Sequence, residues 1–257
     1  MITKFKDDLD IKYSKDAISL WIENFNDSKQ FAKYFIEDYS ANHDYIWTIH
    51  DDNVVSMAYI IKKNVLIKGS ISVVYLIVGM ATKNIYSKKG LMKNIINLIL
   101  EKYKNEFIFM QADHWEYYKN WNFLNVSSIY NYKVKHCNHE KIMIDNFIDW
   151  SSMNKQFNNQ GSIQYDIKSF QEYINMFIID GAKIASIGET YIVYKNNTVI
   201  NFAFKEFKTF INLLNMCEIN FLQTHFPIES NYLSLKNEKK YTKSTHIFSN
   251  VIFNSLF

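Results

Sequence analysis

Six consecutive residues in the first half of the chain have types that could hold an anion. They read SKKGLM from Ser87 to Met92, with Lys88, Lys89 and Gly90 at the point where a polar turn becomes an apolar helical pattern. The first turn of a helix has backbone N–H groups without an intrahelical partner, and such groups bind phosphates. We therefore expect this loop to hold the pyrophosphate of a cofactor. The alternative is an ordinary turn between a strand and a helix.

A second constellation, HCNHE at His136–Glu140, has residue types that bind metals. Its ligands are crowded in sequence, and the second pair that a zinc site normally has is missing. The chain also has no Gly-rich dinucleotide fingerprint, no Walker loop and no G-x-S-x-G element. We therefore expect no metal site and no chemistry of those three classes.

The loop must be positioned by the elements on either side of it. The β-branched apolar run Val73–Ala81 predicts a strand before the loop, and apolar residues at helical spacing up to Leu100 predict a helix after it. Upstream, helical stripes and period-two patterns predict two helices and three strands, with hairpin turns at 51–53 and 68–70. Downstream, the pattern predicts these elements in order: a strand at 107–110, a short helix and a strand at 126–134.

The second half of the chain repeats this order in a weaker form. Helical stripes at 148–157 and 170–179 precede strand-like runs that include a hairpin turn at Asn196–Asn197, and a helix at 206–216 precedes a last strand. Nothing between Phe204 and Phe210 resembles SKKGLM. We therefore expect two domains, at 1–136 and 137–257, with the chemistry in the first.

Composition narrows the class of function. The 257 residues are 48% hydrophobic and can bury a sizeable core, and a net charge of +3 is too small to indicate a nucleic-acid partner. All 29 basic residues are Lys, so an anion site must use backbone amides and Lys point charges. Two cysteines, no signal-peptide core and no apolar run near the ~18 residues of a membrane span favour a cytoplasmic protein without a membrane partner.

Two stretches resemble a known family. GMATKNIYSKKGLM, from Gly79 to Met92, is similar to the segment G-V-A-T-x-P-x-Y-R-G-K-G-L-M of the Eis-type group of GNAT-superfamily N-acetyltransferases. YKNWNF, from Tyr118 to Phe123, is similar to the Y-R-K-F-G-Y element of the same group. The resemblance covers residues 1–135 well and the remainder faintly. It implies an α/β fold with a mixed sheet, in which a GNAT unit is followed by a second, degenerate GNAT-like unit without the sterol-carrier-like domain.

The resemblance also implies a cofactor, acetyl-CoA. The pantetheine arm would bind along the strand at Met80, Ala81 and Thr82, where the Met80 N–H would polarise the thioester carbonyl. The pyrophosphate would bind at the six residues of the SKKGLM loop, which are Ser87, Lys88, Lys89, Gly90, Leu91 and Met92. Ser87 replaces the Arg of the family motif and Lys88 replaces a Gly. Met92 replaces the small residue of the wider superfamily motif, at a position where the Eis-type group itself has larger residues.

The reaction implied is direct attack of a substrate amine on the thioester. Tyr118 stands where the family has its general acid, which protonates the leaving thiolate, and a buried structural tyrosine is the alternative. In Eis-type proteins the chain's own terminal carboxylate is implicated as the base, and the apolar end of this chain suggests that the carboxylate of Phe257 has this role. Other base candidates are Asp113, His114 and Glu116.

The resulting prediction is an acetyl-CoA-dependent N-acetyltransferase for a primary amine of a small molecule. By family analogy, the acceptor would be an aminoglycoside or a polyamine-like compound. One alternative is a degenerate GNAT that binds CoA or a partner without acyl transfer, and another is an interaction protein with no affinity for the cofactor. The sequence leaves a homo-oligomer open.

Overall fold

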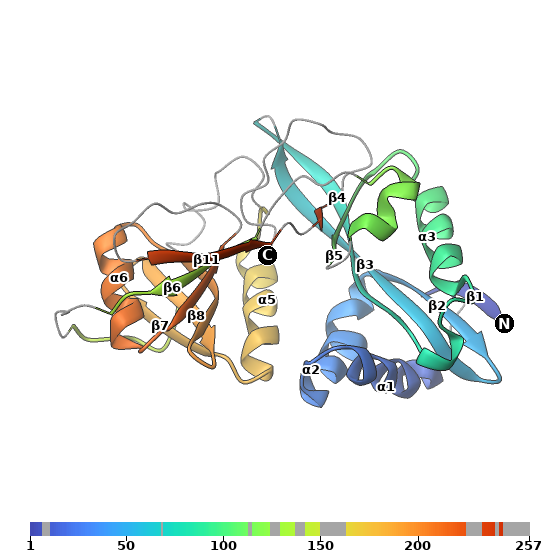
Figure 1. The fold of residues 1–257 in the computed structure, drawn as a ribbon, viewed down its shortest axis with the longest axis horizontal. Coiled ribbons are helices and arrows are strands. Elements are labelled where there is room, and N and C mark those ends of the chain that lie inside the picture. The colour runs from blue at the N-terminus through green and yellow to red at the C-terminus, as the bar shows by residue number, and fades with distance from the viewer. Residues whose placement is uncertain are drawn as a thin grey trace. The chain divides into compact units, whose positions relative to one another are not determined.

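The structure is a computed structural model. It describes residues 1–6, 11–67, 69–112, 115–123, 129–136, 142–149, 163–224, 233–239 and 242–243. The chain forms two compact units (Figure 1). Of the described residues, the first unit contains 1–63 and 73–111, and the second contains 64–72 and 112–243.

The first unit contributes five strands to its sheet, in the order β1-β2-β3-β4-β5. They are β1 (Ile2–Phe5), β2 (Asp44–His50), β3 (Asn53–Ile67), β4 (Ser70–Thr82) and β5 (Phe107–Ala112). β2 is antiparallel to both β1 and β3, whereas β4 and β5 are parallel. A parallel pair needs a crossover connection, and the helix α3 (Leu91–Lys102) provides it.

Helices cover both faces of this sheet. In Figure 1, α1 (Ser14–Asn24) and α2 (Lys29–Lys33) lie on one side of it, and α3 lies on the other. Short helical turns complete the unit: η2 (Ile11–Tyr13), η3 (Tyr34–Tyr39, π-helical), η4 (Ser40–Asn42) and η5 (Asn84–Tyr86). The α2 start is capped as its sequence predicts, because the Ser28 side chain accepts a hydrogen bond from the Phe31 N–H.

The second unit has its own mixed sheet, in the order β11-β6-β10-β9-β8-β7. The helices and strands of the second unit are η6 (Trp115–Trp121), β6 (Ile129–Val134), α5 (Ile167–Ile179), β7 (Lys183–Ile187), β8 (Thr190–Lys195), β9 (Thr198–Ala203), α6 (Phe207–Met216), β10 (Phe221–Thr224), β11 (Leu233–Lys239) and β12 (Thr242–Lys243). β9 and β10 are parallel, and the other pairs in this sheet are antiparallel.

Neighbouring residues of β8 pack against different helices. Ile192 belongs to a buried cluster with Phe210 and Leu213 of α6, whereas the Tyr191 ring lies 6.3 Å from the Phe170 ring of α5. Because successive side chains of a strand point to opposite faces, α5 and α6 cover opposite faces of this sheet. This unit is therefore layered in the same way as the first.

These elements confirm the predicted α/β class with mixed sheets. The hairpin turn at Asn196–Asn197 is also confirmed, with φ of 49° and 59° at its two residues. The helix predicted at 148–157 falls mostly outside the described residues, and 148–149 are not helical. The domain boundary at 136 stays a prediction. No helix in the described part of the chain is long and apolar enough to cross a membrane.

Candidate active site

The junction between β4 and α3 leaves the first turn of the helix open to a ligand. Gly90 is the N-cap residue, with φ 80° and ψ 5°, and no side chain caps the helix. A Cβ at this position would have nothing within 4 Å, so glycine is favoured by the left-handed backbone and not by lack of space. Since the first turn also lacks an acidic residue, the N–H groups of Leu91, Met92 and Lys93 can donate hydrogen bonds to an anion.

Positive charge accompanies these N–H groups. Lys88 and Lys89 are both exposed, and Lys88 has a positive φ of 61°. The Lys89 Nζ lies 4.8 Å from the centre of the Tyr86 ring, which holds the ammonium close to the loop. The Ser87 N–H is already used, because it donates to the Asn84 carbonyl at 3.0 Å. The loop thus combines backbone donors with two Lys charges, and Ser87 contributes no free amide.

The C-terminal part of β4 extends beyond its pairing with β5. The register of the two strands runs from Val74 opposite Phe107 to Ile77 opposite Met110, whereas β4 continues to Thr82. Val78, Gly79 and Met80 are consecutively half-buried in a strand whose neighbouring residues are mostly buried. A ligand can therefore approach the backbone of β4 at these three residues.

The direction of the Met80 N–H follows from the contacts between β4 and β3. The Lys83 N–H donates to the Val55 carbonyl on β3 at 2.9 Å. Successive N–H groups alternate between the two edges of a strand, so that of Ala81 also faces β3 and that of Met80 faces the other edge. At that edge the register with β5 has already ended.

Ala81 and Thr82 are held to β3 by side-chain hydrogen bonds. Ser56 Oγ donates to the Ala81 carbonyl at 3.0 Å and lies 2.7 Å from Thr82 Oγ1. These contacts fix the position of the strand end immediately before the loop. They also occupy the Ala81 carbonyl and the Thr82 hydroxyl, which makes the Met80 N–H the polar group best placed for a ligand.

Tyr118 lies on η6, a 3-10 helix in the second unit. Its ring is half-buried, with an edge-to-face contact to Phe123 at 6.2 Å and a tilted contact to Trp121 at 6.3 Å. Burial raises the pKa of the Tyr118 phenol above its ordinary value. By contrast, Tyr117 is 71% exposed. Of the two neighbouring tyrosines, Tyr118 is the one with the more buried ring.

Most candidates for the general base lie outside the described residues. These are Asp113, His114 and the carboxylate of Phe257. Glu116 is described, and it is exposed in the first turn of η6.

The described residues contain no cluster of His, Cys, Asp and Glu that could hold a metal. In the HCNHE segment, the His136 ring lies 3.1 Å from the Asn220 side-chain oxygen. The other residues of that segment, 137–140, lie outside the described residues.

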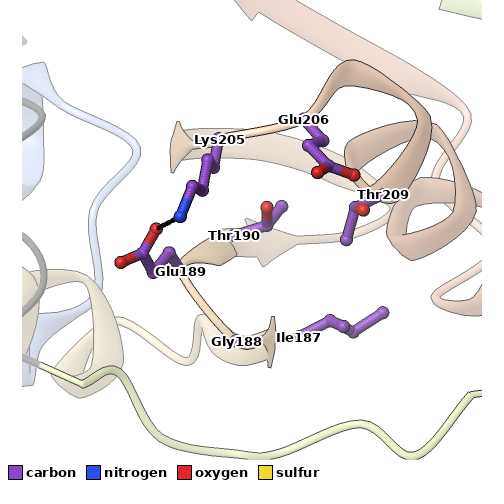
Figure 2. Close-up of a pocket in the computed structure, with 7 residues that line it drawn as sticks. All are labelled: Ile187, Gly188, Glu189, Thr190, Lys205, Glu206 and Thr209. Atoms are coloured by element: carbon purple, nitrogen blue, oxygen red, sulfur yellow. Dashed lines mark ion pairs between the residues drawn. The ribbon is translucent and has the colours of Figure 1, made fainter.

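The second unit has a strand-to-helix junction of its own, which borders a pocket of about 280 Å³ (Figure 2). The pocket lies between the β7–β8 turn and the start of α6, and its polar lining includes Glu189, Thr190, Lys205, Glu206 and Thr209. Figure 2 shows the Lys205 and Glu189 side chains directed toward each other, with Nζ and Oε2 at 2.8 Å. The nearby cation is thus already paired, and two carboxylates line the pocket, which makes it a poor site for a phosphate.

Comparison with known proteins shows a likeness to the GNAT acetyltransferase domain in the first part of the chain. Residues 7–123 match the family model described as the acetyltransferase (GNAT) domain. That segment contains β2 to β5, the β4–α3 junction and Tyr118. No curated protein matches the chain in sequence.

Solved structures extend the likeness to the second unit. Eis1 from Mycobacterium abscessus is 8% identical, with a TM-score of 0.64, and the match covers 95% of this chain and 73% of that protein. A GCN5-related N-acetyltransferase from Kribbella flavida is 9% identical, with a TM-score of 0.68 and coverage of 95% and 71%. N-myristoyltransferase from Saccharomyces cerevisiae, solved with bound myristoyl-CoA, is 9% identical, with a TM-score of 0.53 and coverage of 86% and 76%. At these identities the likeness is one of fold, and it covers both sheets.

Sequence reasoning missed one residue pair in this region. Helical spacing with Ile18 and Phe25 assigns Trp21 to the core, and the sequence pattern gives no conformational role to Gly79. In the structure, Gly79 has a φ of 59° and the Trp21 ring lies against it. The available signal was a glycine inside an apolar strand, which indicates a bulge or a close approach of another group.

Proposed function

We propose that this protein is an acetyl-CoA-dependent N-acetyltransferase that acts on a primary amine of a small molecule. The observation that carries the proposal is the β4–α3 junction, where an uncapped helix start, two exposed lysines and a strand end beyond its β5 pairing occur together. This combination suits a long ligand with a phosphate group at one end and a polar group that can bind along a strand. An acyl-CoA has both features.

The cofactor would bind in two parts. The amides of the first helical turn, from Gly90 to Met92, would hold the pyrophosphate, and Lys88 and Lys89 would supply the positive charge. The pantetheine arm would follow the open edge of β4 at Met80–Thr82. One of the proteins of similar fold, N-myristoyltransferase from Saccharomyces cerevisiae, was solved with bound myristoyl-CoA.

The chemistry would be a direct acyl transfer. The amine nitrogen attacks the thioester carbon, a C–N bond forms, the C–S bond breaks, and its electron pair leaves with the sulfur. The Met80 N–H would stabilise the developing oxyanion, and Tyr118 would protonate the CoA thiolate. The phenol of Tyr118 would carry its proton at neutral pH, as an ordinary tyrosine with a pKa of about 10 does, and burial raises the pKa further. The carboxylate of Phe257 stays the prediction for the base that takes the amine proton.

The acceptor class rests on the Eis-type resemblance of the loop. It indicates aminoglycosides or polyamine-like compounds, acetylated in the cytoplasm. The rival is a degenerate GNAT protein that binds CoA without transfer, and the observation that favours it is Ser87, which replaces the motif's Arg and whose N–H is already occupied.

A thiol-release assay with acetyl-CoA over a panel of aminoglycosides and polyamines separates these two functions. Tyr118→Phe should lower kcat by about 100-fold, the contribution of a general acid, and leave the Kd for CoA unchanged. Tyr117→Phe is the matched control and should keep full activity, since Tyr117 is exposed. Wild-type binding of CoA without thiol release over the whole panel would support the rival, and equal activity of the two variants would remove Tyr118 as the acid.

A further inference from the structure

Gly79 differs from the other described glycines that have a positive φ. Gly69, Gly90, Gly181 and Gly188 would have nothing within 4 Å of an added Cβ. A Cβ on Gly79 would lie 2.4 Å from Trp21 Cζ3 and 3.1 Å from Tyr59 Cδ2. The β4 backbone at Gly79 is therefore constrained twice, by a left-handed conformation with φ 59° and by an aromatic ring packed directly against it.

The Trp21 ring is itself held in place. It is 5% exposed, and its Nε1 donates to the Asp27 carboxylate at 2.8 Å. Its ring centre lies 4.7 Å from that of Phe35 and 4.8 Å from that of Phe25. A ring with neighbours on several sides and an anchored N–H cannot move away from β4 without disrupting the packing of α1.

The bend at Gly79 controls the group that the proposed reaction needs. The peptide unit between Gly79 and Met80 carries the Met80 N–H, so the backbone angles of Gly79 set the direction of this donor. The bend comes two residues after Ile77, where the register with β5 ends. The donor is thus directed by the Gly79 backbone and not by pairing with β5.

We propose that Trp21 is a positioning residue for acyl transfer, which holds the Gly79 bend of β4 so that the Met80 N–H points at the thioester oxygen. The inference rests on the proposed function. In the proposed reaction, Trp21 touches neither the cofactor nor the substrate, and it acts only through the backbone of β4. Misplacing an oxyanion donor by about 1 Å can cost on the order of 100-fold in rate, so a packing residue can have a large kinetic effect.

The test compares two buried tryptophans of the same unit. Trp47 is 1% exposed on β2, its Nε1 has no hydrogen-bond partner among the described residues, and it is not among the atoms nearest to Gly79. Trp21→Leu should lower kcat by about 30-fold and change the Kd for CoA by less than about twofold, because the phosphate loop lies elsewhere. Trp47→Leu should lose comparable thermal stability and keep kcat within about threefold of the wild type. Trp21→Phe, which keeps a ring against Gly79, should limit the loss of kcat to about fivefold.

Two outcomes would overturn the proposal. One is an equal kcat for folded Trp21→Leu and Trp47→Leu, and the other is a loss of kcat in Trp21→Leu that Trp21→Phe does not recover. If Trp21→Leu does not fold, Trp21→Phe and Trp47→Phe carry the same comparison, with an expected loss of kcat of about fivefold in the former only.

A second readout separates this proposal from the proposed function. In protein labelled with ¹⁵N-methionine, the Met80 amide resonance should shift on addition of acetyl-CoA in the wild type and in Trp47→Leu but not in Trp21→Leu. If the wild type releases no thiol with any amine, the proposed function fails, and the Met80 resonance still tests the positioning role. A Met80 shift of equal size in Trp21→Leu and the wild type would reject that role whatever the activity.

Discussion

The β4–α3 junction of the first unit and the β9–α6 junction of the second unit have similar architecture and opposite suitability for binding an anion. In the first unit, β4 is followed by a long loop, a glycine N-cap and a first turn without acidic residues. In the second unit, β9 ends at Ala203 and α6 begins at Phe207, with Glu206 as an N-cap residue whose side chain makes no cap hydrogen bond. A helix start attracts anions through its N–H groups, and a carboxylate at the same position opposes a bound phosphate.

The difference teaches that a repeated architecture does not repeat a site. Both units place a helix start at the end of a strand, and only the first has a left-handed glycine as the N-cap residue of that helix. In the second unit, Lys205 is paired with Glu189 at 2.8 Å, so its charge is neutralised locally. We therefore expect one cofactor site per chain, at the β4–α3 junction.

Reversing the charges of Lys88 and Lys89 should produce the largest difference in CoA affinity between changes at the two junctions. The double variant Lys88→Glu/Lys89→Glu should weaken CoA binding by about 50-fold in a calorimetric titration, because two attractive charges near the pyrophosphate become repulsive. Lys205→Glu in the second unit is the control and should leave the affinity unchanged. Equal losses in the two variants would mean that the second junction also contributes to binding.

A pair of glycine substitutions should have a smaller effect. Gly90 and Gly188 both have a positive φ, 80° and 56°, and open space for a Cβ. Each change to Ala should lower the thermal midpoint by a few degrees, because a left-handed residue with a Cβ costs about 1–2 kcal/mol. Only Gly90→Ala should also weaken CoA binding, by about tenfold, and retention of wild-type affinity in that variant would show that the N-cap conformation is not needed.

The smallest expected effect is a pH dependence confined to the first unit. Burial, together with Lys63 and Lys6, lowers the pKa of His43 to about 4, from 6.5. The folded state then binds fewer protons than the unfolded state. The contribution of His43 to the free energy of unfolding is therefore complete above about pH 6.5 and is lost as the pH falls toward 4. Denaturant midpoints at pH 7.5 and pH 5 should therefore differ less in His43→Phe than in the wild type, and an unchanged difference would contradict the assignment.

Much of the fold could be predicted from local patterns. The stripe of α1, the Ser28 cap and the strand–loop–helix around Gly90 follow from spacing and capping chemistry within a few residues. The loop residues were identified for the same reason, because a glycine between lysines at a helix start has a local meaning.

The bend at Gly79 could not be predicted in the same way. The Trp21 ring that packs against Gly79 lies far away in the sequence, and periodicity assigns that tryptophan to the core. The partner of Lys205 is likewise non-local, because Glu189 lies in the turn before β8, so sequence alone does not reveal that the cation is neutralised.

Hydrogen exchange of the full chain with and without acetyl-CoA tests the central claim most directly. The claim is that one of the two junctions binds the cofactor. We expect added acetyl-CoA to slow amide exchange at 78–82 and at 87–93 and to leave exchange at 204–210 unchanged. Slower exchange at 204–210, or no change at 87–93 under saturating cofactor, would contradict it.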